Sequence, residues 1–134
     1  MANALYVKGK EKILSAAINF TTDTLKVALV KNDYAQNLTT DEYYTSISAS
    51  VLGTPQTLLT PSVTGGTFDA ADATFVAVTA GSTSEGVVIY KDTGVAGTSP
   101  LIAYIDTITG FPLLTNGGDI TVQWDGGIYK IFSL

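Results

Sequence analysis

Two carboxylates three residues apart, in the segment Asp69-Ala-Ala-Asp72, are the first candidates for chemistry in this chain. Together with Glu85 or Asp92 from a distant segment, they could offer oxygen ligands to a hard cation such as Ca²⁺. The spacing is not that of a calcium-binding loop, and acidic side chains in surface turns are common. The sequence therefore favours a solvated turn here, and we expect neither a metal ion nor another cofactor.

The residue types on which most enzymes depend are missing. The chain has no His, no Cys and no Arg, so a Ser or Thr nucleophile has no imidazole base and no thiolate is available. A Ser-x-x-Lys pair and a glycine-rich phosphate loop followed by Lys-Ser or Lys-Thr are also absent. An acid pair for glycoside hydrolysis cannot be recognised from sequence spacing. The composition indicates a protein that is not an enzyme.

The charge balance bears on the partners. Seven lysines face twelve acidic residues, for a net charge of -5, whereas nucleic-acid binding relies on Lys and Arg neutralising phosphates. Lys8, Lys10 and Lys12 cluster, but Glu11 interrupts them. No apolar run approaches the roughly 20 residues of a membrane span, and the N-terminus lacks the pattern of a signal peptide. We therefore expect a soluble product of the cytoplasm that binds neither nucleic acid nor membrane.

The N-terminal segment is the longest with helical periodicity. Apolar residues recur there at intervals of about three to four, Asn3 can cap a helix, and Gly9 weakens one by about 1 kcal/mol relative to Ala. The pattern predicts a helix or arm over residues 1–20. A second, shorter helical turn is expected where Thr39 and Glu42 have the spacing of a capping box.

From Asp23 onward the pattern has a period of two, which is typical of strands. Leu25, Val27 and Leu29 would share one face, with Lys26, Ala28 and Val30 on the other. Further strands are predicted at residues 48–52, 56–59, 66–69, 74–79, 86–91, 101–106, 119–124 and 128–132. Short strands separated by Gly, Asn, Asp and Pro turns are typical of antiparallel folds. The sequence thus predicts a single β-rich domain over residues 1–134: an antiparallel β-sandwich, jelly-roll-like, or a barrel, with one N-terminal helix.

Two strand pairings are predicted from local patterns. Residues 87–93 and 101–107 each form an apolar run with a Tyr that ends in Asp-Thr, so they are expected to be adjacent core strands covered on both faces. The segment Asp125-Gly126-Gly127 lies between alternating runs and predicts a hairpin that pairs residues 120–124 with residues 128–132.

Two segments match the acceptor pattern for N-glycosylation, Asn19-Phe20-Thr21 and Asn37-Leu38-Thr39. Such a modification requires a secreted protein. Because the N-terminus has no export signal, we interpret both matches as chance.

The aromatic side chains could anchor either a core or an interface. Most are expected in the core, but Phe111, in a loop beside Pro112, and the pair Tyr43-Tyr44 are not explained by a strand. Exposed aromatic rings would also suit a carbohydrate-binding adhesin module, which stays an alternative. The candidate protein interface combines these aromatics with residues of the N-terminal segment: Leu5, Tyr6, Lys8, Tyr43, Tyr44 and Phe111.

Several stretches together resemble small structural proteins of tailed bacteriophage virions, most similar to capsid cement or decoration proteins. The stretches are Met1-Ala-Asn-Ala-Leu-Tyr-Val-Lys-Gly-Lys-Glu, Lys26-Val-Ala-Leu-Val, Val88-Ile-Tyr-Lys-Asp-Thr-Gly, Ser99-Pro-Leu-Ile-Ala-Tyr-Ile-Asp-Thr and Asn116-Gly-Gly-Asp-Ile-Thr-Val-Gln-Trp-Asp. The resemblance spans most of the chain, and the segment from about residue 33 to residue 80 matches only loosely.

The resemblance implies a protein that binds the outside of a phage head in many copies. Its partner would be the major capsid protein, whose subunits it would bridge as a homo-oligomer, a dimer or a trimer, after synthesis in the host cytoplasm. An N-terminal arm or open strand edges are the expected bridging devices. Removing residues 2–12 should then abolish binding and leave the fold intact. A tail, baseplate or fibre component is the alternative of the same class.

Overall fold

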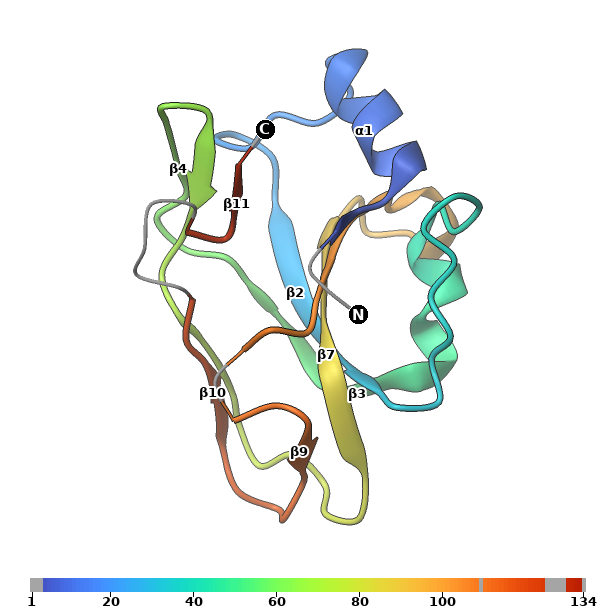
Figure 1. Ribbon diagram of the computed structural model, residues 1–134, viewed down its shortest axis with the longest axis vertical. Helices are drawn as coiled ribbons and strands as arrows, with labels where there is room; N and C mark the ends of the chain where they lie inside the picture. The colour runs from blue at the N-terminus through green and yellow to red at the C-terminus, as the bar shows by residue number, and fades with distance from the viewer. Residues whose placement is uncertain (1–3, 109, 125–129, 134) are drawn as a thin grey trace.

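The computed structural model describes residues 4–108, 110–124 and 130–133 (Figure 1). The fold is mainly β with antiparallel sheets and one N-terminal α-helix, as predicted. Among the described residues the sheets do not close into a barrel. The elements in chain order are β1 (Ala4–Leu5), α1 (Val7–Leu14), β2 (Leu25–Lys31), the short 3₁₀ helices η1 (Tyr44–Ser46) and η2 (Ser48–Ser50), β3 (Val51–Thr57), β4 (Ser62–Thr64), β5 (Thr67–Asp69), β6 (Ala73–Phe75), β7 (Thr83–Lys91), η3 (Ala96–Thr98, 3₁₀), β8 (Leu101–Ile105), β9 (Leu113–Leu114), β10 (Ile120–Val122) and β11 (Phe132–Ser133).

The main sheet has the strand order β1-β8-β7-β2-β3, and β9 pairs with the beginning of β7. Strands β7 and β8 are antiparallel neighbours, with Val88 opposite Tyr104. All five residues of β8 are buried. The predicted pairing of these two apolar segments, and the covering of both their faces, is therefore confirmed.

A separate core lies against each face of the main sheet. Leu25, Val27 and Leu29 belong to the first core, while Ala28 and Val30 belong to the second. The period-two assignment of β2 is thus confirmed, including the face on which each of these side chains lies. The two smaller sheets, β10-β6 and β11-β5-β4, pack against the first face and contribute buried side chains to the first core: Phe68, Ala73, Phe75, Ile120 and Val122.

The second face is covered by residues between β2 and β3. Ile47 is fully buried there, beside Tyr90 and Tyr104 of the sheet, and Leu38 packs on the same cluster. Figure 1 shows this covering segment, drawn in cyan to green, lying across the sheet from β4 and β10. The main sheet is therefore buried on both sides, which explains its near-continuous apolar strands.

The N-terminal segment differs from the predicted helix over residues 1–20. Ala4 and Leu5 form a strand that pairs with Tyr104 and Ala103 of β8, so helix α1 begins only at Val7. It ends at Leu14, and Ala16 adopts a positive φ of 63° that is incompatible with a continuing helix. The proposed cap Asn3 lies outside the described residues. No helix in the described ranges is long and apolar enough to cross a membrane.

Three further predictions are corrected. The second helical turn forms at Tyr44–Ser46, after the proposed capping box of Thr39 and Glu42, and residues 48–50 are 3₁₀ helix instead of strand. Strand β10 pairs with β6 and β11 pairs with β5, so the two are not partners in one hairpin. The reason is aromatic packing, because Phe132 lies opposite Phe68 and contacts Phe20. The turn predicted at residues 125–127 lies outside the described residues.

Candidate protein-binding groove

Three of the six predicted interface residues pack inside the chain. Tyr6 is fully buried, and its hydroxyl hydrogen-bonds the Tyr34 hydroxyl at 2.7 Å. Leu5 packs against the first core, and the ring of Tyr44 lies 4.8 Å from that of Tyr90. In the isolated chain Tyr6 is part of the interior, whereas Leu5 and Tyr44 are partly buried and keep some accessible surface.

The other three predicted residues are also partly buried, and two of them, Lys8 and Tyr43, both lie near Glu42. Lys8 forms an ion pair with Glu11 at 3.3 Å on the surface of α1. The half-buried ring of Tyr43 lies 5.2 Å from the Lys12 ammonium. Phe111, also half-buried, packs against the first core. None of the described aromatic residues is among the exposed large hydrophobic side chains, so no platform of exposed rings is found there.

Two of the acidic residues considered as metal ligands, Asp72 and Asp92, have structural partners. Asp72 Oδ1 accepts a hydrogen bond from the backbone N–H of Trp124 at 3.0 Å. Asp92 forms an ion pair with Lys26 at 2.9 Å. Asp69 lies in β5, opposite Ser62. In the described part of the chain, no group of three or more acidic side chains could hold a metal ion.

An apolar groove lies between the loop that joins α1 to β2 and the edge of the small sheet at β4. It has a volume of about 340 Å³ and is lined by Ala16, Ile18, Asn19, Phe20, Thr21 and Val63. The ring of Phe20 lies 5.0 Å from that of Phe68, so one wall of the groove continues into the first core. The groove is therefore an opening onto packed apolar surface, suited to an apolar side chain of a partner.

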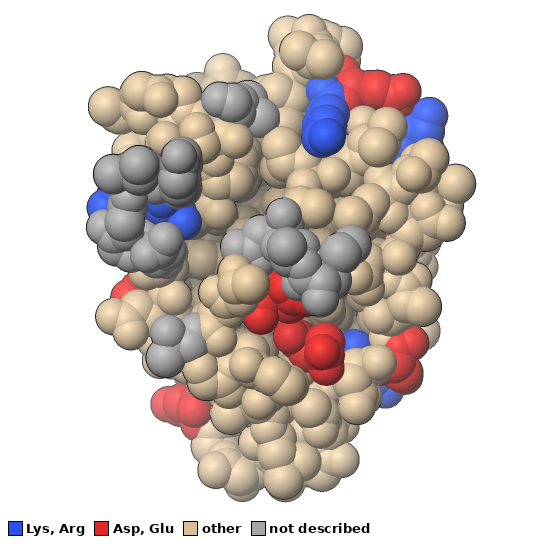
Figure 2. All heavy atoms as spheres, in the orientation of Figure 1, with Lys and Arg blue, Asp and Glu red and all other residues tan. Residues whose placement is uncertain are grey.

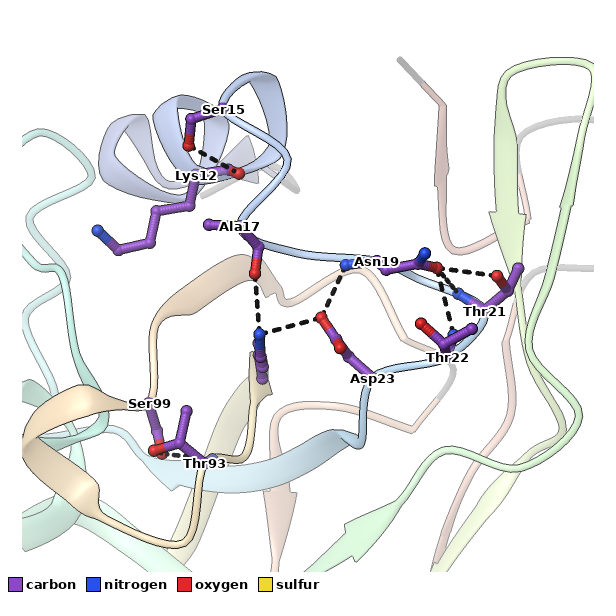
Figure 3. Close-up of polar contacts among 10 residues, drawn as sticks. Lys12, Ser15, Ala17, Asn19, Thr21, Thr22, Asp23, Thr93 and Ser99 are labelled. Carbon is purple, nitrogen blue, oxygen red and sulfur yellow. Dashed lines mark hydrogen bonds and ion pairs between the residues drawn. The ribbon is translucent and has the colours of Figure 1, made fainter.

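The loop beside the groove is held by a capped turn, residues 19–23 (Figure 3). Asn19 Oδ1 accepts the backbone N–H groups of Thr21 at 3.0 Å and Thr22 at 3.2 Å. In return, Asp23 Oδ2 accepts the Asn19 N–H at 2.7 Å, and the Asp23 N–H donates to the Asn19 carbonyl at 2.9 Å. Side chains at both ends thus satisfy the backbone groups of this turn.

The same turn occurs a second time at residues 37–41, where the sequence is again Asn-x-Thr-Thr-Asp. Asn37 Oδ1 accepts the N–H groups of Thr39 and Thr40, both at 3.1 Å, and Asp41 Oδ2 accepts the Asn37 N–H at 2.9 Å. The residue after Asn packs inward in each copy, Phe20 on the first core and Leu38 on the second. The two matches to the glycosylation pattern are therefore parts of a repeated structural turn, which the chance interpretation missed.

Lys91 fastens the first capped turn to the main sheet. Its ammonium donates to the Ala17 carbonyl at 2.8 Å and pairs with Asp23 Oδ2 at 3.1 Å. The hydrogen bond from the Asn19 N–H, followed by the contacts with Lys91, lowers the pKa of the Asp23 carboxyl. The groove wall is therefore held in place before any partner arrives, which reduces the ordering cost of binding.

On the β4 side of the groove, no other strand of the described residues pairs with the outer edge of β4. Strand β4 is the outer member of the sheet β11-β5-β4, and Val63 is 53% exposed. Thr64 and Thr67 flank a two-residue turn, so their backbone groups exchange hydrogen bonds with each other. The next pair along the two strands, Val63 and Phe68, does not exchange backbone hydrogen bonds. The Val63 N–H and C=O consequently point away from β5, toward the side where another strand could add.

Substitution of Asp23, the carboxylate of the first capped turn, tests how much this turn contributes to the stability of the protein. We expect Asp23→Asn to lower the free energy of unfolding by about 1–2 kcal/mol at pH 7, because it removes a charge-assisted hydrogen bond and an ion pair. Since folding lowers the pKa of Asp23, the stabilisation is present above the unfolded-state pKa of about 3.9 and is lost as the pH falls through the folded-state pKa. The difference between the two proteins should therefore shrink in acid.

Denaturant unfolding at pH 7 and in a series below pH 4 measures this effect. The control is Asp33→Asn, because the Asp33 carboxylate is 59% exposed and lies 3.6 Å from Lys31. It should change stability by no more than about 0.5 kcal/mol. Equal effects of the two substitutions would show that the capped turn adds nothing beyond a surface charge.

Comparisons with known proteins do not assign a partner to the groove. No protein-family model matches the chain, and no curated protein was found to be similar to it in sequence.

Proposed function

We propose that this protein is a capsid cement protein, which binds the outer surface of a bacteriophage head and bridges neighbouring subunits of the major capsid protein. The observation that carries the proposal is a preformed apolar groove beside an open strand edge, in a chain without His, Cys or Arg. Such a surface suits the binding of a protein segment. The sequence resemblance to capsid decoration proteins supports the same reading.

In the proposed mode of binding, an extended capsid segment adds to the edge of β4. Its backbone bonds to the outward N–H and C=O of Val63, and one apolar side chain enters the groove beside Phe20. Because β4 has only three residues, each contact is weak. Many copies on one shell compensate, since linked weak contacts reinforce one another.

The copy number in purified virions is the first test of this proposal. Quantitative mass spectrometry against the major capsid protein should find hundreds of copies, in a simple ratio to the capsid subunit. A small copy number that is a multiple of three or six would replace the cement function with a tail, baseplate or fibre function. Absence from the particle would overturn the virion proposal.

The groove itself is tested by Val63→Asp, which places a charge at the strand edge and keeps the backbone donors. We expect co-sedimentation with shells that lack the protein to fall about tenfold or more, because a charge cannot enter an apolar site without a partner. The matched control is Val95→Asp in a distant loop, where the side chain is 60% exposed. It should bind as the wild type does. Equal binding by all three proteins would exclude the groove and the β4 edge as the capsid contact.

A further inference from the structure

Lys10 is the one lysine of the described residues whose ammonium group is not engaged in an ion pair or another contact. Five lysines pair with acids, namely Lys8 with Glu11, Lys12 with Glu42, Lys26 with Asp92, Lys31 with Asp33 and Lys91 with Asp23, and Lys130 also has a contact. Lys10, exposed on α1, has no acidic partner within the described ranges. A surface cation of this kind is available to another molecule.

On the outer face of α1, Lys10 lies between two exposed apolar side chains, Val7 and Leu14. Val7, three residues earlier, is 39% exposed, and Leu14, four residues later, is 87% exposed. Residues at these spacings share one side of a helix. The opposite side of α1 carries Gly9 and rests on β8. This outer stripe (Val7, Lys10, Leu14) is therefore a helix face with no partner in the described chain.

A surface of the opposite charge lies around β9 and the beginning of β7. Leu114 of β9 is 67% exposed and lies opposite Thr83, two residues from the exposed Glu85. No basic side chain pairs with Glu85 in the parts of the chain that the structure describes. Glu85 and Asp106 both lie near the Tyr104 hydroxyl, where burial first and then these two carboxylates raise the pKa of Tyr104 to about 12.

The two surfaces lie at opposite ends of the molecule. Figure 1 shows α1 at one end and β9 at the other. Figure 2 shows lysine side chains together with acidic ones beside α1 at the top, and further acidic side chains below the centre of the same face. One copy therefore cannot bring its own stripe onto its own acidic surface, whereas a second copy can.

We propose that copies of this chain associate head to tail, with the outer stripe of one copy on the surface around Leu114 and Glu85 of the next. Lys10 of one copy forms an ion pair with Glu85 of the other. The exposed leucines, Leu14 of the first copy and Leu114 of the second, become covered by the contact. A contact between two different surfaces forms a ring or an open chain. Of the two oligomers expected from the resemblance, a trimer is compatible with this contact and a two-fold dimer is not. The proposal does not depend on a capsid.

Two single variants separate the two halves of this contact in the full chain. Leu14→Asp removes the stripe and Leu114→Asp removes its receiving surface, and both sites are exposed, so the fold should survive, as circular dichroism would verify. Sedimentation equilibrium at protein concentrations up to about 1 mM should show that the wild type associates. Either variant should weaken this association about tenfold or more. The control Leu59→Asp, at a side chain that is 62% exposed elsewhere, should associate as the wild type does.

Mixing the variants tests the head-to-tail arrangement. An equimolar mixture of Leu14→Asp and Leu114→Asp should form a dimer with one copy of each and nothing larger, since each retains the half that the other lacks. Lys10→Glu and Glu85→Lys should each weaken association, and the two together in one chain should restore it. A wild type that stays monomeric at about 1 mM, a mixture without mixed dimers, or a double variant that is not restored would overturn the proposal.

Discussion

Replacing Gly9 with Ala should destabilise this protein by about 1–3 kcal/mol, although the same change stabilises an ordinary helix by about 1 kcal/mol. A Cβ at this position would lie 2.5 Å from the Leu101 carbonyl oxygen and 3.2 Å from the Ile102 Cα. Both are backbone atoms at the beginning of β8, a strand that is buried along its whole length, and neither can rotate away. Helix α1 would have to move off the strand, so the packing loss exceeds the gain in helix propensity.

Chemical denaturation of Gly9→Ala, with Gly97→Ala as the matched control, measures this effect. Gly97 also lies in a short helix, its φ is not left-handed, and nothing lies within 4 Å of an added Cβ. The control should differ from the wild type by no more than about 0.5 kcal/mol. A Gly9→Ala protein as stable as the wild type would mean that α1 does not rest closely on β8 in solution.

The close packing at Gly9 also fixes what the outer face of α1 can do. Because the inner face touches β8 backbone, Val7, Lys10 and Leu14 are held on a rigid support instead of on a mobile arm. A rigid helix face loses little conformational freedom on binding. The same glycine thus links the folding of the N-terminal segment to the proposed contact between copies.

Three strands of the main sheet, β2, β7 and β8, could be predicted because their signals are local. The alternation of Leu25, Val27 and Leu29 with Ala28 and Val30 identifies β2 and both of its faces. The paired apolar runs identify β7 and β8 as neighbours. These residues are buried on both sides of one sheet, so their sequence pattern and their environment agree.

The ends of the chain could not be predicted in the same way, because their structure is decided by partners far away in sequence. Leu5 and Tyr6 fit a helical pattern, yet β8 offers an edge for Leu5 and the second core offers a site for Tyr6. Strand β11 similarly pairs with β5 because Phe132 joins the ring cluster of Phe68. Tertiary packing overrides the local preference at each of these positions.

The candidate groove could have been located in part from the sequence. The repeat Asn-x-Thr-Thr-Asp, at residues 19–23 and 37–41, is visible in the sequence and specifies both capped turns. Asn and Asp at the ends of a short polar segment are typical turn residues. The groove itself requires Val63 of β4 to lie beside Phe20, and no local pattern predicts that contact between distant segments.

Deletion of residues 2–12 should unfold the protein, in contrast to the sequence-based expectation that the fold would remain. The deletion removes Tyr6, which is fully buried and hydrogen-bonded to Tyr34, and loss of a large buried aromatic side chain alone costs about 3–5 kcal/mol. It also exposes the edge of β8 that pairs with Ala4 and Leu5. Because the whole stability of a domain is about 5–15 kcal/mol, these losses together leave little or none.

Circular dichroism and limited proteolysis of the deleted chain test this expectation. The control is a full-length chain with Lys8→Ala, Lys10→Ala and Leu14→Ala, which changes accessible side chains of α1 and keeps Tyr6 and Gly9 in place. It should unfold within about 1 kcal/mol of the wild type. If the deleted chain is folded and the control is not, the N-terminal segment is a separable arm. If the deleted chain is unfolded, its failure to bind a shell carries no information about the binding surface, and only the control variant can show whether α1 contacts a partner.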